Sequence, residues 1–332
     1  MRTTGLPLIA TVTPNPAWDV TYEVPALVPG EVHRVTRVHR RLGGKGVNAA
    51  RVLHAVGHDA IAILPGPAGL AAEAGLPDAS ARPPAGPKGH AAGPWLACDV
   101  VPGLPAVRQT LVVQGDDGIT TSLWEPGSSP DPGTGEALSD RVAAWLGTDG
   151  QAAGLVVSGS LPPGLDARLP VRLAALAVGA GLPAVIDTSG EALRHAVLAP
   201  GVVLTPNAAE LSQLTGRDCP DVAEAASAAR GLLASGPEAI VVTLGASGLV
   251  AVTRNGTWHG RLAEPLEGNP TGAGDAAAAA LIAGLAAAVG WPQIVAGAVA
   301  TSAAAVMSPI AGDVAPADVA RLSKHVVVRE VA

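Results

Sequence analysis

Hydrophobic positions recur with two different periods along the chain. From about residue 132 onward, short apolar runs such as 154–158, 184–187 and 239–243 alternate with segments in which apolar residues have helical spacing. Apolar runs of this length between helices are typical of parallel strands that are buried on both faces. The pattern therefore predicts an α/β fold with a largely parallel sheet flanked by helices.

Two regions nearer the N-terminus break this regularity. Residues 20–24 and 32–38 alternate apolar and polar positions, and the segments 110–114 and 120–124 flank the turn sequence Gly115-Asp116-Asp117-Gly118. Strands with one polar face, together with a hairpin signal of this kind, favour a small separate sheet. The sequence therefore predicts a β-sheet lid beside the main sheet.

We expect a single domain over residues 1–332, in which the lid strands come from about 14–40 and 107–125. The stretch 66–106 is rich in proline, glycine and alanine and shows little periodicity. For this stretch we predict loops with short helical pieces, and we assign it no chemistry.

Composition excludes several classes of function. A net charge of −7 leaves no basic face for nucleic acid or an anionic membrane. Cys98 and Cys219 are isolated, so they form neither a metal motif nor a disulfide framework. The apolar stretch 276–289 is shorter than a membrane span, and the N-terminus lacks a signal-peptide pattern. We expect a cytoplasmic protein without nucleic-acid or membrane partners.

The strongest candidate for chemistry is residues 269–275, which lead directly into an alanine-rich helical segment. The amides of Gly272, Ala273 and Gly274 should lie at a helix N-terminus without intrahelical partners, where they can bind a phosphate or a developing anion. Asp275 in the first turn can take a proton from a substrate hydroxyl beside this site. Ordinary helix capping explains the same residues equally well at this point.

Seven motifs in a fixed order resemble the PfkB (ribokinase-like) carbohydrate kinases, and especially the branch of 1-phosphofructokinase and tagatose-6-phosphate kinase. The resemblance covers roughly residues 8–310 and is weak in 66–106. The motifs lie at residues 13–19, 43–51, 158–164, 187–190, 205–211, 243–248 and 272–275.

The resemblance implies a ribokinase-like α/β fold and a kinase that uses ATP and Mg²⁺. Asp275 corresponds to the family's general base, and the amides of Gly272, Ala273 and Gly274 correspond to its anion hole. Such transfer consists mostly of positioning and charge stabilisation.

The sugar-binding positions of the family match Asp19, Gly43, Gly44, Lys45 and Asn48. Gly43 and Gly44 allow close approach of the backbone to a sugar, and Lys45 supplies a charge suited to a phosphate. We expect Lys45 to hold the sugar phosphate together with Arg108 and Ser160. A solvated lysine is the alternative for Lys45 when it is considered without its neighbours.

Two further residues, Arg108 and Ser160, resemble the positions that hold the phosphate already present on the substrate. Arg108 lies in Val107-Arg108-Gln109-Thr110, where the family often has Thr-Arg-x-Asn. A surface arginine without a ligand is the alternative interpretation.

On the nucleotide side, Asn207, Thr243, Gly245 and Gly248 match the family's nucleotide-binding positions. Asn207 and Glu210 match its Asn-x-x-Glu motif, which orders Mg²⁺ partly through water. The same pair also fits a helix capping box, and both descriptions can hold together.

We therefore expect ATP-dependent phosphorylation of a phosphorylated ketohexose, with fructose 1-phosphate favoured and tagatose 6-phosphate or fructose 6-phosphate as other candidates. Two alternatives stay open: a kinase for an unphosphorylated sugar or nucleoside, and a non-catalytic sugar-phosphate sensor. Thr205, where the branch usually carries lysine, keeps the sensor in consideration. An apolar lid face also predicts a homodimer through the lid.

Overall fold

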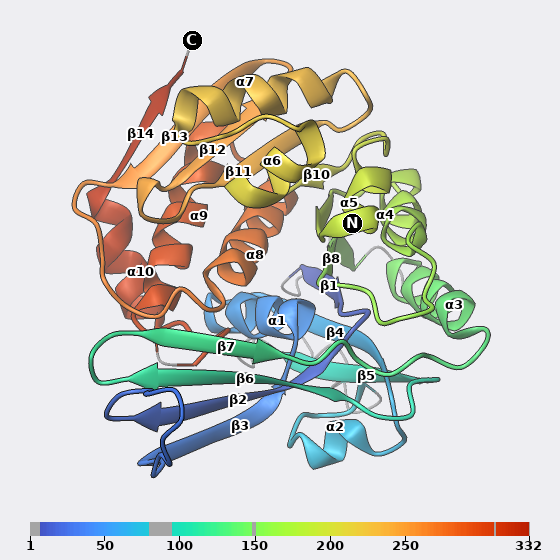
Figure 1. Cartoon of the computed structure of the whole chain (residues 1–332). Coiled ribbons are helices and arrows are strands. Elements are labelled where there is room, and N and C mark those ends of the chain that lie inside the picture. The colour runs from blue at the N-terminus through green and yellow to red at the C-terminus, as the bar shows by residue number, and fades with distance from the viewer. Residues whose placement is uncertain (1–6, 80–94, 148–150, 309, 332) are drawn as a thin grey trace, which may run out of the picture.

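The computed structural model describes residues 7–79, 95–147, 151–308 and 310–331. Its main feature is a ten-stranded sheet between two layers of helices (Figure 1). Seven neighbouring strands, from β5 (Leu96–Pro102) at one edge of the sheet to β11 (Ala239–Thr243), are parallel. The other three strands, β12 (Leu249–Thr253), β13 (Gly256–Leu262) and β14 (Val326–Glu330), continue the sheet antiparallel to the opposite edge. The strands in spatial order are β14 (Val326–Glu330), β13 (Gly256–Leu262), β12 (Leu249–Thr253), β11 (Ala239–Thr243), β10 (Val203–Leu204), β9 (Ala184–Asp187), β8 (Ala152–Ser158), β1 (Leu8–Val12), β4 (Asp59–Gly66) and β5 (Leu96–Pro102).

Helices cover both faces of the main sheet. In β1, Ile9 packs into one hydrophobic core, while Leu8, Ala10 and Val12 pack into the other. Because both faces are buried, these strands have the continuous apolar sequences that predicted a parallel sheet. The first core is built with α1 (Lys45–Ala55), α2 (Leu70–Glu73), α8 (Ala273–Ala286), α9 (Trp291–Val306) and α10 (Pro316–Leu322), and the second with α3 (Thr134–Leu146), α4 (Leu169–Gly179), α5 (Gly190–Ala196), α6 (Ala208–Thr215) and α7 (Val222–Leu233).

A second sheet of four strands has the order β3-β2-β6-β7 and lies below α1 in the view of Figure 1. We call it the lid sheet. Its central strands β2 and β6 are parallel, and the outer pairs are antiparallel. The strands are β2 (Ala17–Val24), β3 (Arg37–Gly43), β6 (Arg108–Gly115) and β7 (Thr120–Trp124). The α/β fold and the small additional sheet predicted from the sequence are thus present.

The strand predicted at 32–38 was misplaced by several residues. The strand at this place is β3, whose pairing with β2 runs from Ala17 opposite Gly43 to Glu23 opposite Arg37. Pairing with β2 therefore stops at Arg37, and Val32 lies outside the sheet with 97% of its surface exposed. Alternation in the sequence did not reveal where the partner strand ends.

The prediction of loops throughout 66–106 was also wrong in part, and residues 80–94 lie outside the described residues. Leu96–Pro102 forms β5, which pairs in parallel with β4 at the edge of the main sheet. Asp99 interrupts the apolar pattern of this strand, but Arg141 and the indole of Trp145 both donate to its carboxylate. The charge is satisfied by α3, a contact that the local sequence does not show.

In the part of the chain that the structure describes, no helix combines the length and hydrophobicity needed to cross a bilayer.

Candidate active site

Three elements bring polar side chains together at the ends of the parallel strands. Asp275 lies in the first turn of α8 and is 6% exposed, and Asn48 lies in α1 and is 4% exposed. The Asn48 Nδ2 atom donates to Asp275 Oδ2 at 3.1 Å and to Asp19 Oδ2 at 3.1 Å. Asp19 belongs to β2, so this amide connects the lid sheet to the core of the protein. Residues 19, 48 and 275, which are far apart in sequence, form one hydrogen-bonded group.

Close contacts within the protein surround the two glycines before α1. A Cβ atom on Gly43 would lie 2.0 Å from Asp19 Oδ2. Gly44 has φ 93°, and a Cβ atom there would lie 2.8 Å from Thr13 Cγ2. The sequence predicted glycine here for close approach of a sugar, whereas the structure shows close approach of the Asp19 carboxylate and of Thr13.

At the start of α8 the main chain turns tightly. Gly272 has φ 86°, and a Cβ atom there would lie 2.9 Å from the Gly312 nitrogen. Among the described residues, the amides of Gly272 and Gly274 have no hydrogen-bond acceptor. Ala273 differs from the expectation of a free amide, because it donates to the Pro270 carbonyl at 3.2 Å. The helix N-terminus therefore keeps donors available for an anion, but fewer than the three predicted.

Burial sets the proton affinity of Asp275. Burial, assisted by the charges of Asp187 and Asp19, raises the pKa of Asp275 to about 7, while Lys45 and the hydrogen bond from Asn48 oppose this rise. A carboxylate with a pKa near neutral pH holds a proton more readily than an exposed one, and this suits a general base at that pH.

Lys45 extends toward the carboxylates at the core side of the site. Its Nζ atom lies 3.2 Å from Asp187 Oδ1, and its side chain is 40% exposed. Burial lowers the pKa of Lys45, but the charges of Asp187, Asp275 and Glu210 outweigh this effect and raise it overall. The ammonium group is charged and lies among carboxylates on the side of α6.

Asp187 was not among the predicted site residues, although the sequence contained a signal for it. It is the last residue of β9, and it accepts a hydrogen bond from Ser158 Oγ at 2.8 Å as well as the one from Lys45. Polar side chains at the carboxyl ends of parallel strands commonly face the ligand crevice of an open α/β sheet. That rule, applied to β9, would have included it.

Arg108 and Ser160 lie on either side of a short segment after β7. Arg108 Nη1 donates to the Glu125 carbonyl at 2.7 Å. Asn15 Nδ2 donates to Ser160 Oγ at 3.2 Å and to the Pro126 carbonyl at 3.0 Å. The two predicted phosphate-binding residues are thus connected through 125–126 and Asn15, a residue that sequence reasoning did not select.

The guanidinium of Arg108 is only partly satisfied. Its Nε atom is buried and has no hydrogen-bond partner among the described residues. Burial lowers the pKa of Arg108, although the charges of Asp19 and Glu125 oppose this change. A buried donor without an acceptor is costly, so this group is prepared for an anion.

A pair of arginines beside Asp19 was also missed. Arg41 lies opposite Asp19 in the lid sheet, and buried nitrogens of Arg41 and Arg51 have no partner among the described residues. Burial and the neighbouring Arg51 lower the pKa of Arg41 to about 10, while Asp313 and Asp19 oppose this. The period-two pattern of β3 would have placed Arg41 on the same face as Asp19 if the strand had been located correctly.

Three of the four predicted nucleotide-binding residues line a hollow of about 280 Å³ beside α6. Asn207, Thr243 and Gly245 line it together with residues 219–222. Gly248 does not line it: a Cβ atom there would lie 2.0 Å from the Gly260 carbonyl oxygen, so packing between β12 and β13 explains this glycine.

Asn207 and Glu210 form the capping box of α6. The Glu210 amide donates to Asn207 Oδ1 at 2.9 Å, and the Asn207 amide donates to Glu210 Oε2 at 2.9 Å. The described residues contain no cluster of three or more acidic, histidine or cysteine side chains that could hold a metal. Mg²⁺ needs only one or two carboxylates when phosphates and waters complete its shell, and Glu210 Oε1 stays free of the capping box. The residues present therefore fit a sparsely held Mg²⁺.

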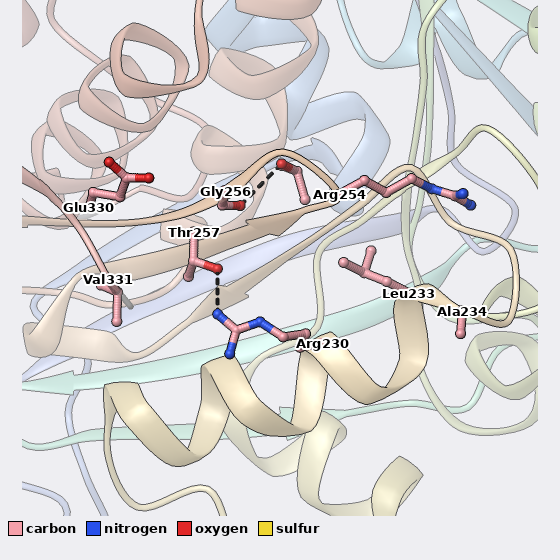
Figure 2. Close-up of a pocket in the computed structure, with 9 residues that line it drawn as sticks. Arg230, Leu233, Ala234, Arg254, Gly256, Thr257, Glu330 and Val331 are labelled. Atoms are coloured by element: carbon pink, nitrogen blue, oxygen red, sulfur yellow. Dashed lines mark hydrogen bonds between the residues drawn. The ribbon is translucent and has the colours of Figure 1, made fainter.

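A second hollow of about 440 Å³ lies at the opposite end of β12 and β13, and the polar side chains that line it do not converge. Arg230 donates to Thr257 Oγ1 at 2.9 Å. Figure 2 shows that Arg254 points away from Arg230 and Glu330. The charged side chains do not face a common point.

The fold and the grouped site define a carbohydrate kinase, and comparison with known proteins gives the same class. The family model described as pfkB family carbohydrate kinase matches residues 142–318, and the chain belongs to this family. The 1-phosphofructokinase of Xanthomonas campestris pv. campestris is 35% identical over 285 residues, which are 84% of this chain and 83% of that protein.

Other relatives are also phosphofructokinases by name. The ATP-dependent 6-phosphofructokinase isozyme 2 of Mycobacterium tuberculosis is 32% identical over 298 residues, which cover 87% of this chain and 80% of that protein. The structure of phosphofructokinase-2 from Escherichia coli in complex with fructose-6-phosphate matches with a TM-score of 0.77 and 26% identity, covering 96% of this chain and 99% of that one. The family and the fold predicted from the sequence are confirmed.

Proposed function

We propose that this carbohydrate kinase transfers the γ-phosphoryl group of ATP to a hydroxyl of a phosphorylated ketohexose, with fructose 1-phosphate as the favoured substrate. The observation that carries the proposal is the buried Asp275, held by the same Asn48 amide that holds Asp19. The names of the relatives support the substrate class, because they include 1-phosphofructokinase and ATP-dependent 6-phosphofructokinase.

In the proposed reaction Asp275 accepts the proton of the sugar hydroxyl. The hydroxyl oxygen forms a bond to the γ-phosphorus, the bond between this phosphorus and the β,γ-bridging oxygen breaks, and ADP leaves with that oxygen. The amides of Gly272 and Gly274 donate to the transferred phosphoryl group at the α8 N-terminus. General-base catalysis of this type contributes roughly 10²–10⁴ in rate.

Lys45 provides positive charge near this transfer. Its position among Asp187, Asp275 and Glu210 favours contact with the transferred phosphoryl group over contact with the phosphate already on the sugar. Mg²⁺, when bound, would neutralise charge on the nucleotide phosphates, and Glu210 with Asn207 would hold it partly through water.

The phosphate already on the sugar is assigned to Arg108 and Ser160. Arg108 offers a buried Nε without an acceptor, and Asn15 fixes the hydroxyl of Ser160 in place. An unphosphorylated sugar would leave this buried donor unsatisfied, which disfavours such a substrate. This is the reason for preferring a sugar phosphate to a free sugar or a nucleoside.

A test is ADP release with fructose 1-phosphate, fructose 6-phosphate, tagatose 6-phosphate, fructose, ribose and a nucleoside as acceptors, each with and without Mg²⁺. We expect the highest kcat/KM with fructose 1-phosphate, and ADP release by Asp275→Asn that is slower by about 10²–10⁴. Faster turnover of an unphosphorylated acceptor would contradict the substrate class. If no acceptor is phosphorylated while a sugar phosphate still binds, the protein is a sensor.

We further propose a homodimer formed through the lid sheet. Among the described residues, eight of the thirteen large apolar side chains that are exposed lie in lid segments. Val38, Leu123 and Trp124 are 57%, 59% and 68% exposed, respectively. Such surfaces mark interaction sites, and phosphofructokinase-2 of Escherichia coli has a tetrameric inhibited form. Light scattering should give twice the mass of the chain, and the mass should halve in Leu123→Lys; a monomeric wild type would contradict the proposal.

A further inference from the structure

Thr110 lies in β6 of the lid sheet and has no role in the reaction proposed above. Its Oγ1 atom lies 2.6 Å from Asp19 Oδ1. A carboxylate oxygen can only accept, so the threonine hydroxyl donates its proton. Bonds of this length are typical of a hydroxyl that donates to a charged carboxylate, and they are stronger than bonds between neutral groups.

This bond is the first of three in a continuous chain. The second oxygen of Asp19 accepts from Asn48 Nδ2 at 3.1 Å, and the same nitrogen donates its other proton to Asp275 Oδ2 at 3.1 Å. Thr110 and Asp19 face each other across two neighbouring lid strands, whereas Asn48 and Asp275 belong to helices of the core. The chain therefore runs from the lid sheet to the proposed base.

The direction of the Asn48 side chain depends on Asp19. Both protons of its amide nitrogen are used by carboxylates, and its Oδ1 atom is buried without a partner among the described residues. If Asp19 turned away, one of the two bonds that keep this nitrogen toward the acids would be lost. The amide could then rotate and present its oxygen to Asp275, which would repel the ionised base.

We propose that Thr110 is a positioning residue for Asp275, acting through Asp19 and Asn48. Its hydroxyl holds the Asp19 carboxylate in one orientation, Asp19 holds the Asn48 amide, and the amide donates to the base. This inference rests on the proposed function, because it assigns Thr110 to the same site. It makes the alignment of the lid strands a condition for a correctly oriented base.

Loss of the Thr110 hydroxyl should change the pH dependence of kcat/KM. The charged groups that act on Asp275 are Lys45, Asp187 and Asp19, and Thr110→Val leaves all three in the chain. Loss of the bond from Asn48 should move the acidic limb of the kcat/KM profile toward higher pH, because that bond favours the ionised base. A residue that only stabilises the lid would leave the limb unchanged.

The test compares Thr110→Val, which keeps the shape but removes the donor, with Thr110→Ser, which keeps the donor. We expect Thr110→Val to lower kcat/KM about tenfold and to shift the acidic limb upward, and Thr110→Ser to restore both. Thr121→Val is the matched control, since Thr121 lies in β7 of the same sheet and its side chain makes no hydrogen bond among the described residues. Melting temperatures of all variants verify folding.

A double-variant cycle tests the path through Asp19. In the D19A background, T110V should have almost no additional effect on kcat/KM, because the carboxylate that accepts from the threonine hydroxyl is already absent. An unchanged pH profile in Thr110→Val, equal losses in the valine and serine variants, or additive losses in the cycle would each overturn the proposal. If Thr110→Val melts below the assay temperature, two measurements test the proposal instead. They are the pH profile of Thr110→Ser and the double-variant cycle carried out at a lower temperature. Activity retained in Asp275→Asn would instead refute the proposed function itself.

Discussion

The main sheet and the lid sheet bury their side chains very differently. All five residues of β1 are buried, and four of the five residues of β11 are buried. In the lid sheet, β7 has no buried residue, and Leu123 and Trp124 are more than half exposed. The main sheet is a scaffold covered on both faces, whereas the lid sheet carries partly buried polar groups and leaves apolar surface open.

This difference separates two requirements of the proposed reaction. The core side of the site holds Asp275 in a buried position, where desolvation raises its pKa to about 7. The lid side holds Asp19 and Arg108 on strands that are only partly buried. A buried base needs a rigid surrounding, while substrate entry needs a region with weaker packing. Substitutions in the two regions should therefore change different quantities.

The largest effect is expected on the core side. Asp275→Asn should lower kcat by about 10²–10⁴, because the base is lost while the shape is retained. It should also stabilise the protein at pH 8. The folded-state pKa is raised from 3.8 to about 7, so the free energy of unfolding falls as pH rises through this interval and the penalty is complete above it.

Removal of this buried charge should raise the free energy of unfolding at pH 8 by an amount on the order of 1–4 kcal/mol, and by much less at pH 4. Steady-state kinetics and urea unfolding at both pH values measure the two effects. Asp140→Asn, an exposed position in α3, is the control. Full activity in Asp275→Asn, or equal changes at both pH values, would contradict the assignment.

The next effect compares stability in the two sheets. Leu155 in β8 is fully buried, and Leu155→Ala should lower the free energy of unfolding by about 2–5 kcal/mol. Leu123 in β7 is 59% exposed, and Leu123→Ala should change the free energy of unfolding by about 0.5 kcal/mol or less in the monomer. Urea unfolding over a range of protein concentration distinguishes the monomer from a dimer. A large loss at Leu123 that depends on concentration would show that the lid surface is covered in an assembly.

Prediction from sequence succeeded where burial repeats along the chain. The strand at 184–187 was predicted with the bounds that the structure shows, because both of its faces are apolar and glycine and proline lie on either side of it. It failed at β3, whose bounds are set by its partner β2, and at β5, where Asp99 is neutralised by Arg141 from another element. Neighbours that are distant in sequence set these features, so no local pattern contains them.

The candidate site shows the same division. Asp275, Asn48 and Asp19 were selected from motifs, and the structure brings them into one hydrogen-bonded group. The connections of Thr110 and Asn15 were not selected, because a single threonine or asparagine in a strand or turn has no distinguishing pattern. Only the register of β2 and β6 shows that Thr110 lies opposite Asp19.

A smaller effect is expected on the lid side. Arg108→Ala should raise KM for a phosphorylated sugar about 10- to 100-fold and change kcat much less, because the guanidinium binds a group that does not react. Arg108→Lys should recover part of the loss, since lysine keeps the charge but not the fork of donors. KM for an unphosphorylated sugar measured with the same variants is the control. Equal losses with both acceptors would mean that Arg108 supports the lid sheet through Glu125 and not a substrate phosphate.

The smallest expected effect is a shift in pH dependence that connects Lys45 with the base. The kcat/KM of the wild type should fall about tenfold per pH unit below a limb near pH 7, where Asp275 becomes protonated. Because the charge of Lys45 lowers the pKa of Asp275, Lys45→Met should move this limb to higher pH, whatever its effect on the maximal rate. Arg108→Met removes a positive charge from the lid side and should leave the limb in place, since Arg108 is not among the groups that act on Asp275. Profiles of kcat/KM measured between pH 5 and 9 distinguish the two variants. An acidic limb that moves equally in both would show that the pKa of Asp275 responds to the net charge of the whole site. Core and lid would then be one region electrostatically.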